Sequence, residues 1–110
     1  AARWGAAAPA LLLADTVKSV DGEGFSTGTA DRQRLRVVQT PQVFRYRILL
    51  DSMESAFKEG FRGTDETSVV ERAGYRIKLI EGSPLNIKVT TPDDWALAEA
   101  ILSQNAPERP

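Results

Sequence analysis

The sequence predicts the end of an α/β domain, and three observations lead to that prediction. Residues 64–94 place a helix start, a short strand, a lysine beside an extended segment and a capped final helix in close succession. Thr91-Pro92-Asp93-Asp94 is typical of a helix N-terminus, because threonine accepts a bond from a free amide, proline suits the first turn and aspartates complement the helix dipole. Residues 10–14 have the length and composition of a buried strand.

Composition narrows the class of protein. With 110 residues, 42% hydrophobic and 26% charged, the chain fits one small globular domain. A net charge of -1 and a pI near 5.5 provide no general attraction for nucleic acid or an anionic membrane, so we expect neither partner. The absence of cysteine and histidine removes thiolate nucleophiles, cysteine metal sites and the usual neutral-pH acid or base. The remaining groups suit phosphoryl or nucleotidyl transfer better than hydrolysis by a triad.

The N-terminal region contains no membrane span, because no apolar run reaches the ~18 residues that a span requires. Residues 6–14 behind Arg3 superficially resemble a signal peptide, but the run is short, contains proline and follows no initiator methionine. A buried strand over residues 10–14 explains this run better, and we expect residues 1–8 to be the end of a connection or helix. Because the chain begins without methionine, we expect a further segment before Ala1.

A hairpin is predicted next, with strands at residues 15–20 and 25–29 joined by the Gly-rich turn 21–24. Its two faces are too polar for either to be buried fully. Since an isolated hairpin is marginal in water, we expect it to pack on another surface, such as a second subunit.

For the middle of the chain, the sequence predicts a strand followed by a helix. The strand covers residues 35–39 and ends at Thr40-Pro41-Gln42, where proline lacks an amide donor and makes a rigid corner. A helix follows over residues 46–59 and ends at Gly60. Its spacing predicts a core face made of Leu49, Met53, Ala56 and Phe57.

The last part predicts two helices around a strand. Thr64 or Asp65 caps a short helix that runs to Arg72, with Val69 and Val70 inward and Gly74 as its end. The remaining elements are a strand at 75–80, a turn at 81–84, an extended segment at 86–89, a helix at 92–104 with Trp95, Ala98 and Leu102 on one face, and a polar tail at 105–110.

Lys88 is the candidate that the local pattern itself suggests. A cation on a strand that leads into a helix start lies near the carboxyl ends of strands, where α/β sheets bind anions. The alternative is a solvated edge lysine, which the local pattern alone favours. The sequence contains no internal repeat, Walker-type loop, GxGxxG loop or metal-ligand cluster.

Six short motifs occur in order along nearly the whole chain: Asp15-Thr16 with Lys18, Thr29 with Asp31-Arg32, Gln39-Thr40-Pro41-Gln42 with Phe44, Thr64-Asp65-Glu66 with Ser68, Glu81-Gly82 followed by Asn86-Ile87-Lys88 and Pro92-Asp93-Asp94, and finally Ala96, Ala98, Glu99, Ile101 and Leu102. Each motif alone is weak, but together they resemble the C-terminal half of the 2-C-methyl-D-erythritol 4-phosphate cytidylyltransferase family.

This resemblance implies a Rossmann-like, nucleotide-diphospho-sugar transferase-like α/β fold, of which residues 1–110 form the C-terminal part of one domain. It implies that residues 15–35 are a hairpin arm that reaches a partner subunit in a homodimer. The implied reaction transfers a cytidylyl group from CTP to 2-C-methyl-D-erythritol 4-phosphate with Mg²⁺, giving 4-diphosphocytidyl-2-C-methyl-D-erythritol and diphosphate. The pathway is non-mevalonate isoprenoid synthesis, in the bacterial cytoplasm or the plant plastid.

The resemblance also implies roles for five residues. Thr16 and Arg32 of the arm hold the substrate phosphate of the neighbouring subunit, while Thr64 and Thr40 contact or support the substrate. Lys88 becomes the catalytic cation beside the reacting phosphates, and these roles fit the joining of two anions.

Local alternatives exist for several of these residues. Arg32 can pair with Asp31 or Asp15 on the surface. Thr16 and Thr64 suit turns or helix caps equally well. Asp65 and Glu66 are better helix-dipole partners than metal ligands, and Lys18 is better explained as an exposed arm residue.

Two features of the family have no counterpart in this sequence: the Gly-rich basic loop that binds CTP and the central acidic segment that binds Mg²⁺ and substrate. We therefore expect no catalysis by these residues alone, no protein ligand for Mg²⁺ among them, and poor folding in isolation because a sheet edge and an apolar face are left uncovered. Two alternatives stay open, namely part of a ribitol-5-phosphate cytidylyltransferase and a non-catalytic dimerisation fragment that would co-purify with a complete enzyme.

Overall fold

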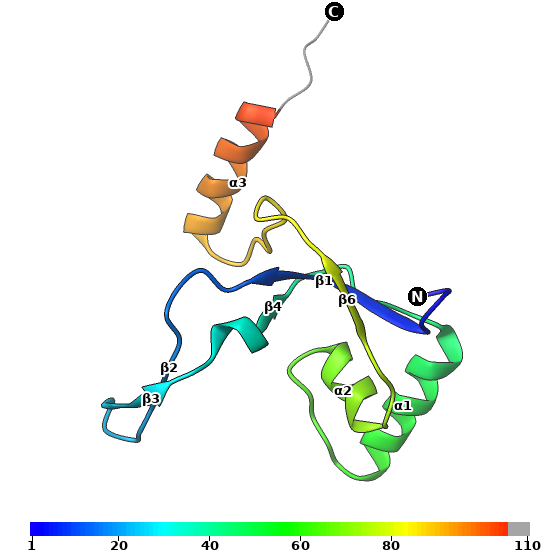
Figure 1. The fold of residues 1–110 in the computed structure, drawn as a ribbon. Helices are drawn as coiled ribbons and strands as arrows, with labels where there is room; N and C mark the ends of the chain where they lie inside the picture. The colour runs from blue at the N-terminus through cyan, green and yellow to red at the C-terminus, as the bar shows by residue number, and fades with distance from the viewer. Residues whose placement is uncertain (106–110) are drawn as a thin grey trace, which may run out of the picture.

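The structure, a computed structural model, describes residues 1–105, and its sheet is built around β1 (Ala6–Leu12). β1 pairs antiparallel with β4 (Arg36–Val38) and β5 (Val43–Phe44), and parallel with β6 (Lys78–Glu81). Ala7 pairs with both Val43 and Lys78, so β5 and β6 lie on opposite edges of β1. Ala10 likewise pairs with both β4 and β6, so β4 lies on the same edge of β1 as β5. This mixed sheet with its helices confirms the α/β class (Figure 1).

The expected position of the first strand was wrong. The strand begins at Ala6 rather than at residue 10 and ends at Leu12, so residues 6–8 are not a connection or a helix. Ala6 and Ala8 are only 1% exposed, which makes this alanine run the centre of the core. Alanine has low intrinsic strand preference, so the local pattern missed it; partners on both edges of β1 decide the conformation instead.

The predicted hairpin is present as β2 (Lys18–Val20) and β3 (Ser26–Thr29), each shorter than expected. The Asp21 carboxylate organises its turn by accepting bonds from the amides of Glu23 (2.9 Å) and Phe25 (3.0 Å). Figure 1 shows the hairpin projecting away from the sheet, and η1 (Arg32–Arg34) follows it as a short 3-10 helix. Val20 and Phe25 are 65% and 68% exposed, so the described part of the chain does not cover them.

The helix predicted at residues 46–59 is confirmed as α1 (Tyr46–Lys58), with Gly60 at φ 68° after its end. Its buried face is different from the expected one. Ser52 and Ala56 are buried, whereas Met53 is 52% and Phe57 88% exposed. Small residues therefore make up the buried part of α1, Leu49 is half-buried, and the larger residues Met53 and Phe57, predicted as core, remain in solvent.

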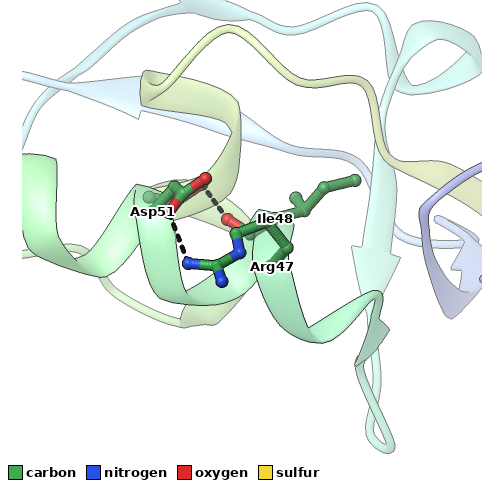
Figure 2. A network of polar contacts seen from close by, with 4 residues as sticks. Arg47, Ile48 and Asp51 are labelled. Carbon is green, nitrogen blue, oxygen red and sulfur yellow. Dashed lines mark hydrogen bonds and ion pairs between the residues drawn. The ribbon is translucent and has the colours of Figure 1, made fainter.

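The solvent side of α1 carries an ion pair between Arg47 and Asp51, one turn apart (Figure 2). Arg47 Nη1 lies 3.7 Å from Asp51 Oδ1, and both side chains are largely exposed. Such a pair stabilises a helix by only about 0.3–0.5 kcal/mol.

α2 (Glu66–Arg72) packs on α1 and buries Val70 completely, while Val69 is half-buried. Its end is the predicted one, because Gly74 adopts φ 96° just after it. Arg72 pairs with Glu59 and lies over the Phe61 ring, which ties α2 to the end of α1. The following strand, β6, covers Lys78–Glu81 rather than 75–80.

α3 (Pro92–Asn105) starts where the sequence predicts. The Thr91 hydroxyl accepts a bond from the Asp94 amide (3.1 Å), and the Asp94 carboxylate accepts bonds from the amides of Thr90 and Thr91 (both 3.1 Å). Trp95 and Leu102, predicted to share one face of this helix, are 62% and 69% exposed because α3 stands away from the sheet (Figure 1). Asn105 of the predicted tail belongs to α3, and residues 106–110 lie outside the described residues.

The overall shape reflects the two projecting elements. The Cα radius of gyration is 17.5 Å, compared with about 13 Å for a compact domain of this size. The hairpin and α3 follow the C-terminal ends of the parallel strands β1 and β6 and project from the sheet in different directions, while α1 with α2 covers one side of it (Figure 1). The cleft described next lies where β4, α2 and the segment after β6 meet.

Candidate functional site

A cleft of about 570 Å³ brings together three segments that are distant in sequence. The end of β4 and the corner after it form one side, the start of α2 forms another, and the extended segment after β6 forms the third. Its polar lining residues are Gln39, Thr40, Gln42, Thr64, Asp65, Glu66, Asn86 and Lys88. A smaller hollow of about 270 Å³ beside Trp4 contains none of the predicted site residues.

Gln39 joins the end of β4 to the loop that follows β6. Its side-chain Nε2 donates to the carbonyls of Ser83 (2.8 Å) and Asn86 (3.0 Å), and its Oε1 accepts from the Ser83 amide (3.3 Å). Asn86 returns a bond from Nδ2 to the carbonyl of Thr40 (2.7 Å). The Thr40 backbone and the segment that carries Lys88 are therefore held against each other.

Gln42 joins the same corner to α2. Its Nε2 donates to Asp65 Oδ2 (2.9 Å), and its Oε1 accepts from the Thr67 amide (3.3 Å). The intervening Thr40–Pro41 peptide bond is cis, and the two glutamines that flank it bind the two other segments of the cleft. The rigid corner predicted from proline is thus the point from which the cleft is assembled.

Asp65 is the N-cap of α2 and makes a capping box with Ser68. Its carboxylate accepts bonds from the Ser68 amide (2.9 Å) and from the hydroxyl of buried Thr67 (2.7 Å). Desolvation alone would raise the pKa of Asp65, but the bonds from Ser68, Thr67 and Gln42 together lower it below its ordinary value. Asp65 is therefore ionised at neutral pH, and its carboxylate is occupied by hydrogen bonds within the protein.

The structure brings three of the five predicted site residues into this cleft, namely Thr40, Thr64 and Lys88. All three are exposed, so each can reach a ligand. Since Asp65 is the cap of α2, the alternative cap role expected for Thr64 does not hold. The ammonium of Lys88 has no ion pair within residues 1–105.

The other two predicted residues, Thr16 and Arg32, belong to the hairpin arm and do not line the cleft. Arg32 Nη1 donates to the carbonyl of Ala14 (2.6 Å), two residues before Thr16, so both lie at the base of the arm. The expected alternative, an ion pair of Arg32 with Asp15 or Asp31, does not occur in the described part of the chain. Lys18 Nζ donates across the hairpin to Thr29 Oγ1 (2.7 Å), which agrees with an arm residue.

Gln39, Gln42 and Asn86 were not predicted from the sequence to have a function. Their contacts span 23 to 47 residues of sequence, so no local pattern contains them. The sequence did contain one signal, the pair of glutamines on either side of Thr40-Pro41. Their long amide side chains lie at a corner where the backbone lacks an N–H donor because of the proline.

The donor set suits an anion better than a metal. Hydroxyls of Thr40 and Thr64 and the ammonium of Lys88 are hydrogen-bond donors for phosphate oxygens. The two carboxylates of the cleft are Asp65, whose oxygens are engaged by α2 and Gln42, and Glu66 in the first turn of α2. Among the described residues, no group of three or more carboxylates gathers where it could hold a metal ion. Among residues 1–105, no helix is long and apolar enough to cross a membrane.

Comparisons with a protein family and with individual relatives agree with each other. The sequence profile of the 2-C-methyl-D-erythritol 4-phosphate cytidylyltransferase family matches residues 1–104. A relative of that name from Geobacillus thermodenitrificans is 48% identical over 108 residues, which are 98% of this chain and 47% of the relative. Another from Desulforamulus reducens is 44% identical over 94% of this chain and 44% of its own length.

Solved structures show the same similarity. The crystal structure of 2-C-methyl-D-erythritol 4-phosphate cytidylyltransferase from Thermus thermophilus matches with a TM-score of 0.81 and 35% identity, over 93% of this chain and 50% of that one. The 4-diphosphocytidyl-2C-methyl-D-erythritol synthase of Anaerococcus prevotii matches with a TM-score of 0.80 and 30% identity, over 90% and 44% of the two chains. The chain thus spans about half the length of the relatives it matches.

Proposed function

The chain belongs to the 2-C-methyl-D-erythritol 4-phosphate cytidylyltransferase family, and we propose that it forms the sugar-phosphate side of such an active site. The protein that contains it transfers a cytidylyl group from CTP to 2-C-methyl-D-erythritol 4-phosphate in non-mevalonate isoprenoid synthesis. The observation that carries this proposal is the cleft, where Thr40, Thr64 and Lys88 meet from three separate segments.

The reaction joins two anions. A phosphate oxygen of the sugar phosphate attacks the α-phosphorus of CTP, a new P–O bond forms, and the bond to the β-phosphate breaks to release diphosphate. The charge that develops on the phosphoryl oxygens requires donors fixed in place beforehand. Lys88 supplies a positive charge at the cleft, and Thr40 and Thr64 supply hydroxyl donors that orient the substrate.

The arm extends this proposal to a homodimer. Thr16 and Arg32 lie at the base of a hairpin that projects from the sheet and leaves Val20 and Phe25 exposed. We assign these two residues to the substrate phosphate bound by a neighbouring subunit, so that one site uses residues of two chains. Mg²⁺ belongs to the proposal as a companion of CTP, held by groups other than the cleft residues of this chain.

The test uses the native polypeptide, captured from its source cells with an antibody against residues 86–94. Its intact mass shows whether it is longer than 110 residues, and diphosphate release is measured with CTP and 2-C-methyl-D-erythritol 4-phosphate. Release with this substrate supports the proposal, and release only with ribitol 5-phosphate identifies the related enzyme instead. A 110-residue polypeptide that shows no turnover and co-purifies with a complete enzyme indicates the dimerisation fragment.

Lys88→Met in the same polypeptide tests the role of the cation. We expect kcat to fall about 10²–10³-fold, as is typical for loss of one group that stabilises developing charge. Lys58→Met is the matched control, since Lys58 is exposed in the last turn of α1, outside the cleft. Equal activities of the two variants would contradict the assignment of Lys88.

A further inference from the structure

We propose that Gln39 is a positioning residue, which fixes Lys88 relative to Thr40 by holding the loop after β6 against the end of β4. The side chain of Gln39 makes three hydrogen bonds to backbone atoms of that loop, at 2.8, 3.0 and 3.3 Å. Both its oxygen and its nitrogen are used, so the amide is bound in one orientation. Lys88 follows two residues after Asn86, the last residue that Gln39 contacts.

Gly82 shows that the loop is fitted to this side chain. A Cβ at Gly82 would lie 2.2 Å from Gln39 Oε1 and 3.2 Å from the backbone nitrogen and oxygen of Ala10. The Gly82 amide also donates to the Ala10 carbonyl (2.9 Å). The absence of a side chain at Gly82 therefore leaves the space that Gln39 occupies against β1.

The segment that carries Lys88 is anchored at its two ends. At one end are the bonds of Gln39 and the bond from Asn86 to the Thr40 carbonyl (2.7 Å). At the other end, Thr90 donates its amide (3.1 Å) and hydroxyl (2.9 Å) to the Asp94 carboxylate. The second anchor belongs to α3, which stands away from the sheet (Figure 1). Within residues 1–105, the first anchor, made by Gln39 and Asn86, is therefore the one that holds Lys88 against the other walls of the cleft.

Gln39→Glu tests this role with a side chain of nearly the same shape. It replaces the donating Nε2 with an oxygen, which then faces the carbonyls of Ser83 and Asn86. In the native polypeptide, we expect hydrogen exchange of the bonded amides of Ser83, Leu85, Asn86 and Ile87 to accelerate at least tenfold, while the amides of α1 keep their rates. Gln104→Glu is the matched control, because it makes the same change on an exposed residue of α3.

Asn86→Asp provides a second variant that does not depend on how well Gln39→Glu folds. It removes the bond to the Thr40 carbonyl, and we expect the same residues to exchange faster. Because the two side chains act through one loop, the double variant should accelerate exchange less than the product of the two single effects. Unchanged exchange in Asn86→Asp, or in a folded Gln39→Glu protein, overturns the proposal.

The catalytic consequence rests on the proposed function and is measured separately. Inorganic phosphate is the probe, and its binding is followed by the NMR shift of the Lys88 ammonium and amide. We expect Gln39→Glu to weaken phosphate binding about tenfold and, in the native polypeptide, to lower kcat while KM for CTP stays within twofold. If exchange accelerates but the unmodified protein binds no phosphate at Lys88, the positioning role stands and the proposed function of the cleft fails.

Discussion

Replacing Asp65 with alanine is expected to destabilise the protein by about 2–4 kcal/mol at pH 7. Loss of an N-cap costs about 1 kcal/mol. The Thr67 hydroxyl, which donates to Asp65 at 2.7 Å and belongs to a residue only 4% exposed, loses its acceptor, and an unsatisfied buried group costs about 1–3 kcal/mol. Gln42 Nε2 loses its bond to Asp65 as well, which loosens the corner that carries Thr40.

Urea unfolding of the native polypeptide, followed by far-ultraviolet circular dichroism, measures this effect. With an m-value of about 1–2 kcal/mol/M, the unfolding midpoint should fall by about 1–4 M. Asp51→Ala is the matched control, because Asp51 also pairs through a carboxylate but at an exposed site on α1, and it should change the free energy of unfolding by less than about 0.5 kcal/mol.

The dependence on pH gives a second check. The pKa of Asp65 is lowered in the folded protein, below the ordinary 3.8. Its ionised form therefore contributes stability in full above that ordinary value, and the contribution is lost as the pH falls through the lower folded-state pKa. The difference between unmodified protein and Asp65→Ala should shrink in that range. A difference below about 0.5 kcal/mol at pH 7, or one that does not shrink, would refute the assigned role.

Three further predictions concern other elements. Gly82→Ala should destabilise the chain by about 1–3 kcal/mol in urea unfolding, because its Cβ would lie 2.2 Å from Gln39 Oε1; a neutral result would show that the loop adapts. Asp94 should titrate by NMR below the ordinary pKa of 3.8, mainly because its carboxylate accepts a hydrogen bond from the Thr90 amide. The start of α3 therefore loses this cap as the pH falls. Titration at or above 3.8 would contradict this. Phe57→Ser should change the free energy of unfolding by less than about 0.5 kcal/mol, as surface substitutions do, because Phe57 is 88% exposed, while raising the concentration at which the chain aggregates; a large loss of stability would mean that Phe57 is buried.

The helix boundaries were predictable from sequence because their causes are local. Gly60 and Gly74 adopt positive φ just after α1 and α2, as the predicted stops require. Thr91 caps α3 through residues within one turn of it. Such signals depend on a few neighbouring residues, so they can be recognised without knowledge of the remaining fold.

Packing faces were predicted less well. The periodicity of α1 correctly placed Ala56 in the core but also placed Met53 and Phe57 there, and both are exposed. Periodicity identifies an apolar face, but only the neighbouring elements decide how much of that face is covered. The same reason explains β1, whose alanine run becomes a buried strand because partners lie on both of its edges.

The sequence by itself determined the α/β class, the hairpin, the caps and the residues that resemble one family, because each depends on short-range chemistry or on ordered motifs. Tertiary structure alone decided that Thr40, Thr64 and Lys88 share a cleft, while Thr16 and Arg32 remain on the arm. It also revealed Gln39, whose contacts lie 44 and 47 residues away in the sequence. Hydrogen bonds over such separations depend on how the fold brings distant segments together, which is why no local pattern contains them.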